Sequence, residues 1–266
     1  MADRASLNPL FNPKSVALIG ASDNATRIGG RPIAYWKQSF KGPIYPVNPR
    51  YETVQGLTAY PAIDKVPGPV DLCIVAVPAA GVVPEIERCA AHGVKSIVLF
   101  SSGFAEMDKA GEAAQRRIGE IARDAGMRIV GPNCLGVVNV AQGMAATFST
   151  SIETGWPKTG PMGIACQSGA MGAHALTLAR ERGIGVSYLC TTGNECDVTV
   201  ADAIDFYVDD PGTKVIVAYL EACNDPPRML AAFDKARAAR KPIVMLKVGA
   251  TEVGAAAAAS HTASLA

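Results

Sequence analysis

Short apolar segments alternate with helix-like segments along this chain, and this alternation is the strongest constraint on its fold. In the first half, strands are expected at residues 15–20, 43–47, 71–77, 95–100 and 128–130, and helices at 28–40, 82–92 and 109–125. In the second half, strands are expected at 161–166, 186–191, 214–220 and 242–248, and helices at 170–182, 200–208 and 227–239. Nearly continuous apolar strands joined by helices predict an α/β fold with mainly parallel sheets, covered on both faces.

Length and composition favour two domains and exclude several classes. The 266 residues include 26 glycines and 18 prolines, which suits short strands and tight turns. A net charge of +1 argues against nucleic acid as a partner. No apolar stretch approaches the roughly 20 residues that span a bilayer, and no signal segment is recognised, so a cytoplasmic protein without membrane contact is expected. Seven scattered cysteines without a CxxC pair indicate neither a disulfide framework nor a metal site.

The polar, loop-like stretch at residues 140–159 is where we expect the domain boundary. It contains glycine and proline residues and separates the two strand–helix series. We therefore divide the chain into domains 1–145 and 146–266. Parallel sheets bind ligands at the carboxyl ends of their strands, so the residues at those ends are the candidates for function.

The first two strand ends of the N-terminal domain favour a phosphorylated nucleotide. Gly20 and Ser22 follow the first strand without the GxGxxG spacing of a dinucleotide site. Arg50 follows the second strand, where an NAD enzyme offers an acid to the ribose hydroxyls. Arginine instead suits a ribose phosphate, as in NADP or coenzyme A, although an exposed turn residue is an equal alternative.

The later strand ends offer small turns and one unusual hexapeptide. Val77 ends the third strand, and the turn after the fourth suits an extended ligand; its residues are Ser101, Ser102 and Gly103. The fifth strand runs into GPNCLG, residues 131–136, where proline and glycine fix a tight backbone. This turn brings the amide of Asn133 and the thiol of Cys134 to one point. The alternative is a turn with a buried cysteine.

The second domain supplies an anion site and a strand-end acid. Ser168 and Gly169 join an expected strand to a helix, which aims free backbone amides outward, although ordinary capping by Ser168 is compatible with this. Glu221 ends the 214–220 strand, where a carboxylate orients or charge-stabilises an imidazole. Taken alone, it reads as a solvated turn acid.

His261 lies on a run of small residues after the last expected strand, where nothing has the bulk to enclose it. An exposed imidazole is a nucleophile or proton shuttle at neutral pH, or simply a solvent-exposed loop residue. His92 is expected at a helix C-terminus and His174 in helix packing, so neither needs a catalytic role.

Taken together, these motifs resemble the NDP-forming acyl-CoA synthetases, which are relatives of succinyl-CoA synthetase. The resemblance covers nearly the whole chain and rests on the loop after SVALIG, then YPVNP, GPNCLG, QSGAMG, TTGNECDV, YLE and SHT, in this order. It implies a Rossmann-like CoA-binding domain followed by a flavodoxin-like succinyl-CoA-ligase domain. His261 matches the family's phosphohistidine, Glu221 the acid that orients it, and Ser168 with Gly169 the helix terminus that receives the phosphate.

Two departures accompany the resemblance. Ala263 stands where the family often has glycine. The nucleotide-binding ATP-grasp domain, which holds ATP or ADP and Mg²⁺, has no counterpart, so we expect a fragment of a longer polypeptide or a subunit with a separate partner. A homo-oligomer is also expected.

The implied reaction joins a small carboxylic acid to CoA. ATP phosphorylates His261, the carboxylate takes the phosphoryl group as an acyl phosphate, and the CoA thiol, held at residues 131–136, displaces phosphate. The sequence does not identify the acyl group.

Two other functions remain open. Ser168, Glu221 and His261 follow the order of an α/β-hydrolase triad, but Cys166 and Ala170 stand where GxSxG needs glycine. The second alternative is a CoA-sensing regulatory module of a protein acetyltransferase, against which the retention of His261 and Glu221 argues.

Overall fold

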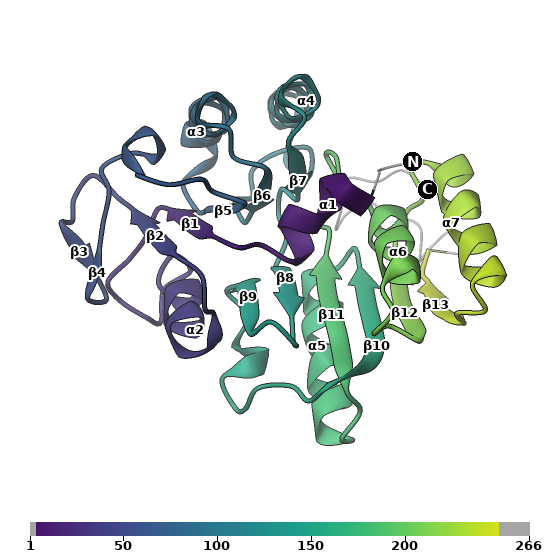
Figure 1. The fold of residues 1–266 in the computed structure, drawn as a ribbon. Coiled ribbons are helices and arrows are strands. Elements are labelled where there is room, and N and C mark those ends of the chain that lie inside the picture. The colour runs from purple at the N-terminus through teal and green to yellow at the C-terminus, as the bar shows by residue number, and fades with distance from the viewer. Residues whose placement is uncertain (1–3, 250–266) are drawn as a thin grey trace.

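A computed structural model describes residues 4–249 and shows two large sheets side by side (Figure 1). The first is a five-stranded parallel sheet in the order β2-β1-β5-β6-β7. Its strands are β1 (Val16–Ile19), β2 (Ile44–Val47), β5 (Leu72–Val75), β6 (Ser96–Leu99) and β7 (Arg128–Val130). The connecting helices are α2 (Arg31–Ser39), α3 (Ala79–His92) and α4 (Lys109–Ala125), with the short turn η1 (Ile63–Lys65) and a hairpin of β3 (Thr53–Val54) and β4 (Leu57–Thr58).

Both faces of this sheet are buried, as its apolar strands predict. Val16 and Leu18 belong to the core cluster that contains Trp36 of α2, whereas Ala17 and Ile19 belong to the cluster under α3 and α4. Successive side chains of a strand point to opposite faces, so a strand covered on both sides must be apolar throughout. The α/β prediction is confirmed.

The second sheet has six strands in the order β13-β12-β10-β11-β8-β9. These are β8 (Gly136–Asn139), β9 (Met144–Thr147), β10 (Thr159–Cys166), β11 (Val186–Thr191), β12 (Val215–Leu220) and β13 (Ile243–Lys247). The helices are α5 (Gly169–Glu181), α6 (Val200–Asp209) and α7 (Pro226–Ala238), with the short turn η2 (Thr150–Ile152). The pairs among β10 to β13 are parallel, and only β8 and β9 join antiparallel.

The expectation of an irregular loop over residues 140–159 is wrong. Met144–Thr147 forms β9, which pairs with β8 at the edge of the second sheet. The sequence MAAT lacks the β-branched run that marks a strand, so only long-range pairing identifies it. Strand β8 ends before residue 145 and β9 contains it, yet both strands belong to the second sheet. The division of the chain at residue 145 stays a prediction.

Helix α1 (Arg4–Phe11) was not expected from the sequence, and it packs between the sheets. Its side chains Leu7, Leu10 and Phe11 are fully buried. The ring of Phe11 stacks on Phe206 of α6 with centroids 4.4 Å apart. Because α1 contacts β6, β7, β8 and α6, it joins the two sheets into one core.

No helix among residues 4–249 is long and apolar enough to cross a membrane.

Candidate functional site

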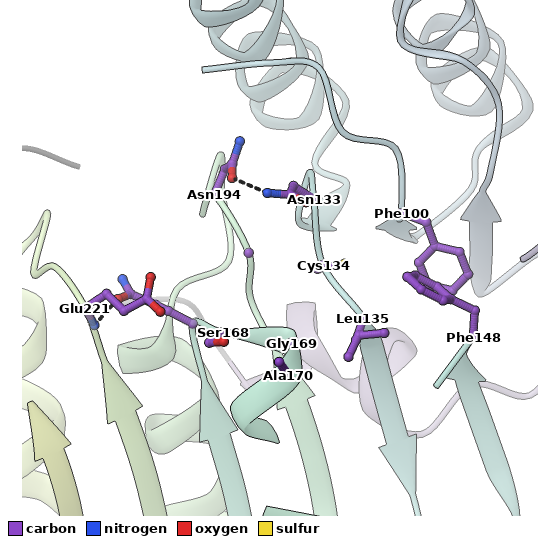
Figure 2. Close-up of a pocket in the computed structure, with 12 residues that line it drawn as sticks. Phe100, Asn133, Cys134, Leu135, Phe148, Ser168, Gly169, Ala170, Asn194 and Glu221 are labelled. Atoms are coloured by element: carbon purple, nitrogen blue, oxygen red, sulfur yellow. Dashed lines mark hydrogen bonds between the residues drawn. The ribbon is translucent and has the colours of Figure 1, made fainter. Parts of the chain in front are cut away.

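A cavity of about 210 Å³ lies where the carboxyl ends of strands from both sheets meet (Figure 2). Its lining residues follow the ends of β6, β7, β9, β10, β11 and β12. They are Phe100, Asn133, Cys134, Leu135, Phe148, Gln167, Ser168, Gly169, Ala170, Gly193, Asn194 and Glu221. Candidate residues that are far apart in the sequence therefore share one site, as expected for parallel sheets.

The start of α5 forms one wall of this cavity. Ser168 is the N-cap residue, and its hydroxyl oxygen accepts a hydrogen bond from the backbone nitrogen of Met171 over 3.4 Å. The first amides of a helix have no partner within the helix and attract anions. A Cβ atom at Gly169 would lie 2.8 Å from Cγ of Leu135, so only glycine lets the helix approach this side chain so closely.

The opposite end of the cavity is apolar. The rings of Phe100 and Phe148 meet edge to face with centroids 4.8 Å apart, and Leu135 lies between them and the start of α5 (Figure 2). The cavity thus has a polar end for an anion and an apolar end for a small hydrocarbon group. Among its lining residues no lysine or arginine is present.

Glu221 lies at the end of β12, next to the start of α5 on the neighbouring strand β10. It is 5% exposed and lines the cavity. Its backbone nitrogen donates a hydrogen bond to Oε1 of Gln167 over 2.6 Å, and its carbonyl oxygen accepts one from Nζ of Lys247 over 2.8 Å. The strand end, and with it the carboxylate, is held from two sides.

Glu195 is a second acid of this region, which the sequence did not single out. Its carboxylate accepts hydrogen bonds from Gln167 Nε2, Thr192 Oγ1 and Val200 N, over 2.9, 2.9 and 2.8 Å. Burial raises the pKa of Glu195 to about 7, although these three donors oppose the shift. Its ionisation therefore changes near neutral pH.

The hexapeptide places the Asn133 and Cys134 positions at the cavity but buries the thiol. Cys134 is 3% exposed, and Sγ donates to the carbonyl oxygen of Leu99 over 3.4 Å. Burial raises the pKa of Cys134 to about 12, so the side chain stays a thiol. This is the buried-cysteine arrangement that the sequence left open. Asn133 has a φ of +57° and donates to Oδ1 of Asn194 over 3.4 Å (Figure 2).

A second cavity, of about 520 Å³, lies at the ends of β1 and β2. Gly20, Ser22 and Arg50 line it, as the strand-end argument expects, together with Arg27 and Gly29. A Cβ atom at Gly29 would lie 2.1 Å from the carbonyl oxygen of Gly20. The two ends of the loop after β1 therefore approach each other so closely that only glycine fits at residue 29. Asn48 helps to hold it by donating from Nδ2 to the carbonyl oxygen of Ala21 over 2.7 Å.

The remaining candidates of the first sheet connect neighbouring strand ends. The hydroxyl of Ser101 donates to the carbonyl oxygen of Val77, and the carbonyl oxygen of Ser101 accepts from Asn133 N over 2.9 Å. Gly103 N donates to Oε1 of Glu106 over 2.6 Å. The two cavities above are not lined by Val77, Ser101, Ser102 or Gly103, and the role of these four residues in binding stays a prediction.

His261 lies outside the described residues, so its predicted role as phosphoryl carrier stays a prediction. His92 ends α3 and is followed by the left-handed cap residue Gly93, as expected. His174, expected to pack inside a helix, is instead exposed on α5, because small neighbours gave no clue to which face of the helix is covered. Among residues 4–249, no group of three or more His, Cys, Asp and Glu side chains is placed to hold a metal ion.

Comparison with known proteins gives two family matches. The model of a CoA binding domain matches residues 14–140, and that of a succinyl-CoA ligase like flavodoxin domain matches residues 159–266. A solved structure of a Ca. Korarchaeum cryptofilum acetyl-coenzyme A synthetase, in complex with phosphate and ADP, superposes with a TM-score of 0.88 at 36% identity. It is matched over 98% of this chain and 55% of its own.

Curated relatives match along nearly the whole chain. The chain is 38% identical to an ADP-forming acetate–CoA ligase II subunit alpha from Pyrococcus furiosus, over 98% of this chain and 56% of the relative. It is also 38% identical to a trans-feruloyl-CoA synthase from an unknown prokaryotic organism, over 98% of this chain and 37% of the relative. The chain thus spans about half or less of the length of these relatives.

Proposed function

Because this chain belongs to the superfamily of NDP-forming acyl-CoA synthetases, we propose that it is the CoA- and phosphate-handling part of an acid–thiol ligase. The ligase joins a carboxylic acid to CoA as ATP is converted to ADP and phosphate. The observation that carries this proposal is the cavity in which the start of α5 at Ser168 and the strand-end acid Glu221 lie side by side.

The steps assigned to this chain follow from the two ends of the cavity. The amides at Gly169 and Ala170, with Ser168, hold the phosphoryl oxygens on the N-terminal end of α5. An oxygen of the substrate carboxylate attacks phosphorus and the bond to His261 breaks, which gives an acyl phosphate. The CoA thiolate then attacks the carbonyl carbon, and inorganic phosphate leaves. Glu221 orients the imidazole of His261.

CoA is assigned to the edge of the first sheet. The second cavity accepts its nucleotide, with Arg50 beside the ribose phosphate and the backbone at Gly20 and Ser22 close to the pyrophosphate. The remainder of CoA passes Val77 and the turn with residues Ser101, Ser102 and Gly103. It reaches the first cavity at Asn133 and the backbone of Cys134. The missing GxGxxG spacing argues against NAD in this place.

ATP and Mg²⁺ are assigned to a separate nucleotide-binding part, on the same polypeptide or on a partner subunit. One relative is named a subunit alpha, and other relatives are longer than this chain, which supports both arrangements. A homo-oligomer and a cytoplasmic location are kept as proposals.

The two alternatives are not favoured. A hydrolase needs a reactive hydroxyl on a nucleophile elbow, yet the Ser168 hydroxyl caps α5 and glycines are missing at Cys166 and Ala170. A CoA-sensing module has no need for an acid and an anion-binding helix terminus at one cavity.

The test uses the full-length protein with its nucleotide-binding part, supplied with CoA, ATP and, in separate reactions, acetate, longer or branched acids and aromatic acids. Acyl-CoA should appear with one ADP and one phosphate. Release of AMP and pyrophosphate, or thioester hydrolysis without ATP use, would contradict the proposal.

A further inference from the structure

The side-chain amide of Gln167 lies at the centre of a hydrogen-bond network beside the first cavity. Oε1 accepts from the backbone nitrogens of Glu221 and Ala222 over 2.6 and 2.9 Å. Nε2 donates to the carbonyl oxygen of Ala222 over 2.8 Å and to Oε2 of Glu195 over 2.9 Å. Gln167 is only 5% exposed, so water does not replace these partners readily.

Only one orientation of this amide satisfies the network. Reversing it would place the amino group of Gln167 against two backbone N–H groups and its oxygen against the carbonyl of Ala222 and the carboxylate of Glu195. Four well-formed bonds on one buried side chain fix the backbone where β12 ends. Gln167 therefore fixes the position of the Glu221 backbone, from which the carboxylate side chain extends.

The charge of Glu195 determines how strongly its carboxylate binds the side-chain amide of Gln167. As a carboxylate, it accepts from Gln167, Thr192 and Val200 with no donor of its own, and hydrogen bonds to an ionised acceptor are about twice as strong as neutral ones. Asp202 of α6 raises the cost of this charge. The thiols of Cys190 in β11 and of Cys223, which follows β12, also lie near Glu195; burial, and to a smaller degree the Glu195 charge, raises the pKa of both, so they stay neutral.

The two arginines of this region pair with another acid. Arg128 and Arg228 both pair with Asp202, which is 1% exposed. Protonation of Glu195 is accommodated at Oε1 if Thr192 turns its hydroxyl toward the carbonyl oxygen of Cys166, which already lies 3.3 Å away. Oε2 then becomes a neutral carbonyl oxygen, and its bond from Gln167 weakens.

We propose that Glu195 is a positioning residue that acts through Gln167: its carboxylate holds the Glu221–Ala222 backbone in place, and its protonation loosens this strand end and slows the ligase reaction. The kinetic half of this proposal, that protonation of Glu195 slows the ligase reaction, rests on the proposed function. The structural half, that protonation loosens the Glu221–Ala222 backbone, does not, because it concerns only two backbone amides of this chain.

The structural half is tested by hydrogen exchange on the full-length protein between pH 6 and pH 8. Protection factors, corrected for the intrinsic pH dependence of exchange, are measured at the amides of Glu221 and Ala222. In the natural protein, protection should fall about tenfold as the pH is lowered. These amides exchange through a local opening that breaks the bond from Gln167 but keeps the Glu195 carboxyl buried, so the opened state binds the proton more tightly than the closed state, unlike global unfolding. In Glu195→Gln it should not depend on pH. A natural protein with pH-independent protection, or a variant that keeps the full dependence, would overturn the proposal.

The kinetic half is tested by the pH profile of kcat for acyl-CoA formation. Because histidines ordinarily change charge in this pH range, the natural protein is compared with Glu195→Gln and with the matched surface variant Glu181→Gln. The fall of kcat from pH 8 to pH 6 should be about tenfold smaller in Glu195→Gln than in the other two proteins. An identical fall in all three contradicts the role of Glu195.

A third variant, Thr192→Val, removes one donor to the ionised carboxylate and leaves Gln167 intact. The midpoint of the protection change should move to higher pH. A midpoint that does not move would show that the titrating group is not Glu195. If the natural protein forms no acyl-CoA at all, the proposed function fails, and the exchange measurements still decide the structural half.

Discussion

The backbone nitrogen of Asn194 donates a hydrogen bond to the carbonyl oxygen of Pro132 over 2.9 Å. This bond joins the turn after β11 in the second sheet to the hexapeptide after β7 in the first. Cys196 N adds a bond to the carbonyl oxygen of Gly131 over 3.0 Å. The walls of the first cavity that come from different sheets are thus fixed relative to each other by backbone.

The close approach of these turns predicts that Gly193→Ala is strongly destabilising. Gly193 has a φ of +61°, and a Cβ atom there would lie 2.3 Å from the carbonyl oxygen of Pro132. We expect a loss of about 2–4 kcal/mol in the free energy of unfolding, measured by urea denaturation. Gly183→Ala is the control, because its φ is +67° but nothing lies within 4 Å. It should cost about 1 kcal/mol. Equal losses would show that strain at φ, and not the contact with Pro132, is responsible.

Arg50 predicts a preference for CoA over dephospho-CoA. If its guanidinium binds the ribose phosphate, Arg50→Ala should weaken CoA binding about tenfold and leave dephospho-CoA binding nearly unchanged. Calorimetry on the full-length protein measures both, with the exposed helix residue Arg116→Ala as control. Micromolar binding of NADH without a response to CoA would contradict the assignment of this domain.

Glu195 also predicts how stability depends on pH. Burial raises the folded-state pKa of Glu195 to about 7 from its ordinary value of 4.5, so its contribution to stability is fully present below about pH 4.5 and is lost as the pH rises through 7. Relative to Glu195→Gln, the natural protein should lose on the order of 2 kcal/mol between pH 5 and pH 8. Denaturation curves across this range provide the measurement. A constant difference between the two proteins would place the titration elsewhere.

Ser168 should behave as a helix cap and phosphate ligand, not as a nucleophile. The full-length protein should not react with a fluorophosphonate probe at this residue. Ser168→Ala should destabilise by about 1 kcal/mol, since the cap to Met171 is lost, and should slow acyl-CoA formation. Stoichiometric labelling of Ser168 would support the hydrolase alternative instead.

The strand-end candidates could be predicted from the sequence because parallel sheets gather the ends of their strands. Ser168 and Glu221 follow adjacent strands, and Gly20 and Arg50 follow another adjacent pair. No side-chain geometry is needed for this inference, since apolar runs separated by helices already imply it.

The network behind these residues could not be predicted in the same way. Gln167 reads as an ordinary turn residue, and its importance depends on amides more than fifty residues away. Glu195 has a positive φ of +59°, and no local sequence pattern predicts this backbone conformation. Likewise α1 contains Pro9 and gains its stability from packing between the sheets, so its local sequence does not reveal it.

The central claim is that His261 carries the phosphoryl group, and mapping the label after incubation with γ-labelled ATP tests it most directly. The full-length natural protein and His174→Ala, a variant of the exposed histidine on α5, should both carry an acid-labile phosphate at His261. Glu221→Gln should form it about 10²-fold more slowly, the lower range for a positioned acid or base. His261→Ala should carry no label and form no acyl-CoA, while it still binds CoA. A His261→Ala protein that retains the phosphoenzyme or the ligase activity would contradict the account.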